Sequence, residues 1–150
     1  DNAGCIEPRV VIKRLPKFIV WSRRKPIDSY DQADLILQEL GKQVPGSARL
    51  VSGTIWHDCG QRTKVIDCEA FWVLNRTIRT GAPNELAPAT VASILHEGDE
   101  STIGASYAIA RRWIADNRFQ IAGPNREIYL GSTGTEPGES ITEIQFPIGN

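Results

Sequence analysis

The chain has 150 residues, of which 41% are hydrophobic and 23% are charged, and its 17 basic and 18 acidic side chains leave a formal net charge of −1 at pH 7. This length and composition are ordinary for one globular domain covering residues 1–150 and exclude a disordered or membrane-spanning chain. The balanced charge argues against DNA binding by this segment alone and against attraction to a membrane. Because no signal-peptide pattern is present, we expect a cytoplasmic protein.

The chain carries none of the common sequence motifs for metal, cofactor or nucleophilic chemistry. Cys5, Cys59 and Cys68 are odd in number and contain no closely spaced pair, so we expect reduced structural thiols. The two histidines, His57 and His96, are not spaced like zinc ligands. Methionine is absent even from position 1, so the chain is either processed or part of a longer protein, in which a DNA-binding domain would lie outside this segment.

In the first half of the chain, the spacing of apolar residues changes from strand-like to helical and back to strand-like, which predicts a β-α-β-β unit. Strand-like runs rich in β-branched and aromatic residues cover residues 9–13, 17–22, 50–56 and 64–74. Between them, residues 31–44 carry apolar side chains at helical spacing, with Ser29 and Gln32 in a capping-box arrangement before the helix.

The second half repeats this order after a Gly- and Pro-rich linker at residues 77–88. Strands are predicted over residues 89–96, 126–130 and 141–146, with a helix that begins near Asp99 or Ser101. The repeat of elements after roughly 71 to 76 residues indicates duplication, with halves at about 9–76 and 86–148. We therefore expect an α+β fold with pseudo-twofold symmetry, in which two curved antiparallel sheets, each backed by a helix, flank a central ligand groove.

Four stretches of the chain resemble the GyrI-like effector-binding domain of bacterial MerR- and AraC-type regulators. They are residues 10–16, residues 86–98, the helix with Tyr107 and Trp113, and residues 123–130 followed by 141–148. The resemblance covers almost the whole chain and implies a pocket between the halves, lined by aromatic side chains and containing one acid. The residue that matches this acid is Glu127, which would supply the counter-charge for a hydrophobic, cationic compound.

Strand alternation places Asn125, Glu127 and Tyr129 on one face of their strand and Arg126, Ile128 and Leu130 on the other. We expect the apolar pair to pack against a helix, which would turn Glu127 toward the open, concave side of the sheet. The alternative is a glutamate exposed to solvent or paired with Arg111.

The other aromatic candidates for the groove are Tyr129, Trp56, Phe71, Trp72, Tyr30, Trp21 and Tyr107. Core packing is the alternative for each. Either Phe71 or Trp72 would face the groove, and Tyr107 lies on the apolar face of its helix. Asp67 and Glu69 could add a second acid near the groove, and the basic run at residues 22–25 is predicted to be a solvated loop.

Three functions follow from these observations. The first is a small-molecule sensing domain, without a cofactor or a metal, that works with a DNA-binding domain in the same full-length chain. The second is a hydrolase that opens cyclopropane-containing natural products, with Glu127 as general base and Tyr129 as its partner. The third is a stand-alone interaction protein similar to gyrase inhibitors. The sequence leaves open whether the protein forms a homodimer.

Overall fold

The computed structural model describes residues 9–58, 65–78, 84–132 and 140–150. Its first half contains β1 (Val11–Leu15), β2 (Phe18–Ile27), α1 (Asp31–Gln43), β3 (Arg49–Trp56), β4 (Ile66–Leu74) and β5 (Asn84–Leu86). The second half contains β6 (Ala89–Glu97), α2 (Ile103–Asp116), β7 (Gln120–Ile121), β8 (Asn125–Ser132) and β9 (Ser140–Gly149). The predicted β-α-β-β order is present as β2-α1-β3-β4 in the first half and, with the short β7 inserted, as β6-α2-β8-β9 in the second.

The strands of both halves form one antiparallel sheet rather than the two separate sheets expected from the sequence. The described strands follow the order β1-β6-β9-β8-β3-β4-β2-β5, and β7 pairs with β9. The two halves are joined in two places. β3 pairs with β8 from Ser52 to Trp56, opposite Tyr129 to Asn125, and β1 pairs with β6 from Val11 to Leu15, opposite Ser93 to Ala89. Origin by duplication and a pseudo-twofold axis remain predictions.

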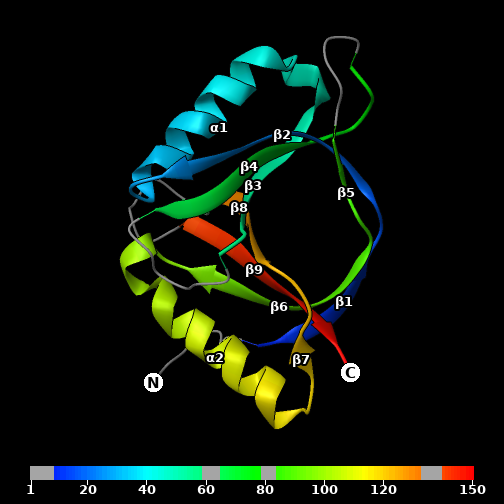
Figure 1. Ribbon diagram of the computed structural model, residues 1–150, viewed down its shortest axis with the longest axis vertical. Helices are drawn as coiled ribbons and strands as arrows, with labels where there is room; N and C mark the ends of the chain where they lie inside the picture. The colour runs from blue at the N-terminus through cyan, green and yellow to red at the C-terminus, as the bar shows by residue number, and fades with distance from the viewer. Residues whose placement is uncertain (1–8, 59–64, 79–83, 133–139) are drawn as a thin grey trace.

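Both helices pack on the same face of this sheet, which we call the helix face. Figure 1 shows α1 and α2 together on one side, while the sheet curls away from them through β2, β5 and β1. The apolar side of α1, centred on Leu40, packs against Ala70 of β4, and that of α2, centred on Ile114, packs against Ile144 of β9. The opposite side of the sheet, the far face, has its own cluster around Phe71.

The orientation predicted for β8 is wrong. Ile128 packs with Phe71 and Val20 on the far face, whereas Tyr129 packs against the core of α1. The curled sheet supplies a second apolar cluster that the sequence pattern does not reveal. Glu127 consequently lies on the helix face and not on a face that the helices leave open.

Two local predictions in the first half are also wrong. The run at residues 22–25 is part of β2, where it pairs with β4, and Arg24 donates hydrogen bonds of 2.9 and 2.7 Å to the carboxylate of Asp67. Cross-strand pairing accommodates these charged side chains. At the start of α1, the side chain of Gln32 accepts a hydrogen bond from the backbone N–H of Asp28, 2.7 Å away, and Ser29 is not the capping residue.

The short strands β5 and β7 lie in segments where the sequence predicts no strand. β5 extends the edge of the sheet beside β2, and β7 pairs with the end of β9. Within the described part of the chain, no helix is both long and apolar enough to cross a membrane.

Candidate functional site

Glu127 lies at the centre of the helix face. In the sheet register it is opposite Thr54 of β3 on one side and Ile144 of β9 on the other. Thr54 belongs to the first half of the chain and Ile144 to the second. The carboxylate therefore lies where the core of α1 meets the core of α2.

Two tyrosines from different parts of the fold donate hydrogen bonds to this carboxylate. Tyr107 of α2 donates a hydrogen bond to Oε2, and the hydroxyl of Tyr129 is 3.1 Å from Oε1. Each phenol is held in turn, because Asn125 Nδ2 donates to the Tyr107 hydroxyl at 2.9 Å and Thr54 Oγ1 is 2.9 Å from that of Tyr129. Glu127 is thus the centre of a polar cluster with apolar surroundings.

The phenols remain protonated in this environment. Burial, followed by the negative charge of Glu127, raises the pKa of Tyr107 and of Tyr129 above the ordinary value of 10. The same two causes raise the pKa of the Cys68 thiol to about 12, which makes this buried cysteine unreactive.

No protein cation forms an ion pair with Glu127 in the part of the chain that the structure describes. Arg111, the pairing partner considered from the sequence, instead places its guanidinium 5.5 Å from the ring centroid of Tyr107 and equally far from that of Phe146. The carboxylate is thus held by phenols alone.

Trp56 and Tyr30 lie next to this cluster on the first-half side. Trp56 is opposite Asn125 on the neighbouring strand, is 7% exposed, and packs edge to face against Tyr30 with ring centroids 5.2 Å apart. Its indole N–H is buried without a hydrogen-bond partner among the described residues. An unmet donor of this kind is costly in a folded protein and suits a site where a ligand acceptor completes it.

The other three aromatic candidates make their polar contacts or pack away from Glu127, although Trp21 and Trp72 also border the core of α1. Trp21 donates a 2.9 Å hydrogen bond to Gln43 at the end of α1. Trp72 donates a 3.0 Å hydrogen bond to the backbone carbonyl of Leu37 and borders a cavity of about 710 Å³ beside α1. Phe71 is fully buried on the far face, where it borders a second cavity.

The sequence did not identify Asn125 and Thr54 as members of the site. Alternation placed Asn125 on the strand face of Glu127 without assigning it a role, whereas the position of Thr54 depends on the pairing of β3 with β8. The histidines have other partners: His96 Nδ1 is 2.8 Å from Ser106 Oγ, and His57 Nε2 is 2.8 Å from Glu69. The described residues contain no group of side chains suited to hold a metal ion.

Solved structures share this fold. The C-terminal domain of EcmrR is 24% identical, with a TM-score of 0.84 over 97% of this chain and 99% of that domain. In the EcmrR–DNA complex the identity is 22% and the TM-score 0.83 over 95% of this chain, which spans 58% of the EcmrR chain.

More distant structures share the fold at lower similarity. A hydrolase encoded by lin2189 from Listeria innocua is 11% identical, with a TM-score of 0.63 over 95% of this chain and 91% of that chain. SAV2435 bound to tetraphenylphosphonium is 12% identical, with a TM-score of 0.56 over 95% of this chain and 94% of that chain.

No curated protein sequence matches the chain. The family description "GyrI-like small molecule binding domain" matches residues 28–149, from the start of α1 to the end of β9. This match includes both helices, the central strand pair and every residue of the Glu127 cluster. The chain therefore belongs to the GyrI-like family of small-molecule-binding domains.

Proposed function

We propose that this chain is the sensing domain of a bacterial transcriptional regulator and that it binds amphipathic organic cations at Glu127. The observation that carries the proposal is a carboxylate with apolar surroundings that is held by two phenols and by no protein cation. A cationic ligand would supply the missing opposite charge. SAV2435, which shares the fold, is bound to such a cation, tetraphenylphosphonium.

The aromatic side chains around Glu127 favour the same class of ligand. The face of an aromatic ring attracts a cation, and this attraction contributes about 2 kcal/mol when the pair is desolvated. Tyr30, Trp56, Tyr107 and Tyr129 would supply these rings, with the unmet Trp56 N–H available to an acceptor on the ligand.

Ligand binding would change the contact between the two halves. Tyr107 comes from α2, whereas Tyr129 packs against the core of α1, and both hydroxyls bind the same carboxylate. A cation that competes with one phenol would weaken the link on that side and shift the population of arrangements available to an attached DNA-binding domain. The longer EcmrR chain, 58% of which is spanned by this one, is consistent with such a domain.

Calorimetry on Glu127→Gln tests the proposal. The ligands are tetraphenylphosphonium and the neutral triphenylphosphine oxide. Loss of a charge-assisted contact of about 1.5–3 kcal/mol should weaken binding of the cation about tenfold to hundredfold, with a much smaller effect on the neutral compound. Glu39→Gln, which removes an exposed carboxylate from α1, is the matched control and should leave both affinities unchanged. Equal losses for the two ligands in Glu127→Gln would rule out the carboxylate as the selectivity element.

A hydrolase is the second candidate, because a Glu–Tyr pair can activate and orient a water and because the Listeria innocua hydrolase shares the fold. Incubation with a cyclopropane-containing electrophile, followed by mass spectrometry, separates the two functions. A sensor returns the compound unchanged. A water-addition product that disappears in Glu127→Gln and Tyr129→Phe would replace the sensing function with the enzymatic one.

A further inference from the structure

The far face of the sheet contains a largely buried arginine that has no side-chain partner among the described residues. Arg126 is adjacent to Glu127 on β8 but points the opposite way and is only 8% exposed. Its guanidinium makes no hydrogen bond and no ion pair with any side chain in the described ranges. Burial lowers the pKa of Arg126, as expected for a charge that is not compensated.

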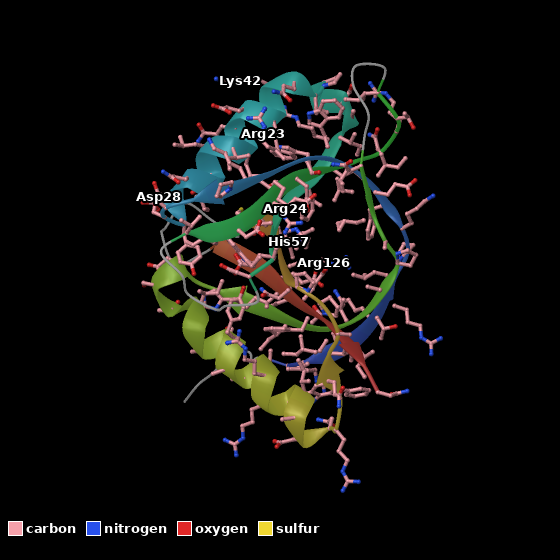
Figure 2. All side chains as sticks on the ribbon, in the orientation of Figure 1. Arg23, Arg24, Asp28, Lys42, His57 and Arg126 are labelled. Atoms are coloured by element: carbon pink, nitrogen blue, oxygen red, sulfur yellow. The ribbon has the colours of Figure 1, made fainter. Side chains whose placement is uncertain are left out.

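This arginine borders a cavity of about 310 Å³ in which the acidic side chains already have cationic or hydrogen-bonding partners. Glu69 is 2.8 Å from His57 Nε2, and Glu85 is 3.3 Å from the ammonium of Lys17. In Figure 2 the labelled Arg126 and His57 lie between the central strands and the arc of β2, β5 and β1.

Glu143, a further buried acid of the far face, is also engaged. It accepts hydrogen bonds from Lys13 at 3.0 Å, Ser93 at 2.7 Å and Gln145 at 3.0 Å. The acids of the far face named here therefore each have a partner, and the guanidinium of Arg126 does not.

A largely buried guanidinium without a partner is unfavourable, and an arginine cannot escape this cost by losing its proton. Its nitrogen atoms still reach solvent, because Trp56 Nε1 is the one fully buried polar side-chain atom without a hydrogen bond among the described residues. The guanidinium has a planar fork of donors that matches a carboxylate. The rest of the cavity wall is largely apolar and includes Val20, Ile55, Phe71 and Leu86. A volume of this size lies at the small end of ligand pockets.

We propose that the far-face cavity binds a small organic carboxylate, whose anionic group pairs with Arg126 and whose apolar body contacts Phe71 and Leu86. This site is separate from the Glu127 cluster because consecutive strand residues point to opposite faces. Its ligand would be an anion, whereas the ligand proposed for Glu127 is a cation. The two proposals therefore do not depend on each other.

Benzoate is a suitable probe, and benzamide is its neutral counterpart of similar shape. Calorimetry on the full chain should show one saturable benzoate site, with benzamide at least about tenfold weaker. Arg126→Met, which keeps an unbranched side chain but removes the charge, should weaken benzoate binding at least about tenfold. Arg24→Met, which removes another arginine of the sheet, and Glu127→Gln should both retain the affinity of the parent protein.

The Met variant is expected to fold, because it removes an unpaired buried charge, and its Tm without benzoate should equal or exceed that of the parent. Benzoate should raise the Tm of the parent but not that of the variant. Amide shifts in NMR spectra should change at Phe71 and Leu86 on addition of benzoate.

Four results would contradict the proposal. They are equal affinities for benzoate and benzamide, no saturable benzoate binding, parent-like affinity in Arg126→Met, or shift changes confined to Glu127 and Tyr129. If Arg126→Met does not fold, the proposal is tested on the parent protein by comparing benzoate with benzamide and by mapping the amide shifts that benzoate causes.

Discussion

Glu127 and Arg126 are consecutive residues of opposite charge that meet different environments because side chains alternate across a strand. Glu127 is held on the helix face by the hydroxyls of Tyr107 and Tyr129. Arg126 is largely buried on the far face, where no described residue forms an ion pair with it. The two proposed sites would therefore take a cation on one face and an anion on the other, and a substitution at either residue should affect only the ligand of its own face.

Glu143 should make stability depend on pH in acid. Burial favours its neutral form, but hydrogen bonds from Ser93, Gln145 and Lys13 outweigh burial and lower its pKa below the ordinary 4.5. As the pH falls below that value, the unfolded chain takes up the proton first. The stabilisation is therefore complete above the ordinary pKa and is lost as the pH falls through the lowered pKa of the folded state.

Urea unfolding of the parent and of Glu143→Gln at a series of pH values measures this effect. Asp67 and Asp99 also have lowered pKa values, so the difference between the two profiles isolates Glu143. Ser93→Ala should bring the folded-state pKa of Glu143 closer to the ordinary value and reduce the difference. A difference that does not vary with pH below 4.5 would contradict the prediction.

Among the secondary-structure elements, the pair β3 and β8 depends on a glycine. A Cβ at Gly53 would lie 2.5 Å from the backbone oxygen of Glu127 and 2.6 Å from the ring of Phe71. Gly53→Ala should therefore separate the central strands and lower the free energy of unfolding by about 1–3 kcal/mol, measured with urea.

Gly104 in α2 is the matched control, because a Cβ there meets nothing within 4 Å. Gly104→Ala should raise the free energy of unfolding by about 0.4–1 kcal/mol, since alanine reduces the conformational entropy of the unfolded chain and favours the helix. If both alanine variants change stability equally, close packing at Gly53 is not the cause.

For the molecule as a whole, the strand pairs β3–β8 and β1–β6 join the two β-α-β-β halves into one sheet. The cores of α1 and α2 are separate clusters, but both rest on this sheet, and the Glu127 cluster connects them. A ligand at Glu127 would consequently contact both halves, because neither half contains the whole Glu127 cluster.

Unfolding should accordingly be a single transition. Amide intensities of Leu40 in α1 and Ile144 in β9, followed by NMR in urea, should fall with one midpoint. Gly53→Ala should lower both midpoints together, because it weakens one of the two strand pairs that join the halves. Two midpoints separated along the urea axis would mean that the halves unfold independently.

Local patterns were sufficient to predict the two helices, the long strands and their order. The helical spacing of apolar residues in residues 31–44 and the β-branched runs show which side of each single element is buried, and this holds however the elements pack together. The short edge strands β5 and β7 were not predicted, because two or three residues are too few to show the alternation of apolar and polar side chains that marks a strand. Strand β2 was cut short because its charged residues resemble a loop, although Arg24 is paired with Asp67 across the sheet.

Residue types and their alternation along the chain determined that Glu127 and Tyr129 share a face, because a period of two is a property of any strand. Tertiary structure decided which face that is. The curl of the sheet creates an apolar cluster at Phe71, and Ile128 packs against this cluster. Glu127, the preceding residue on that strand, therefore lies on the helix face. Tertiary structure also decided that Thr54 and Tyr107 join the site and that no described residue forms an ion pair with Arg126. Such facts depend on strand register and on contacts between residues far apart in the chain, for which a single sequence carries no local signal.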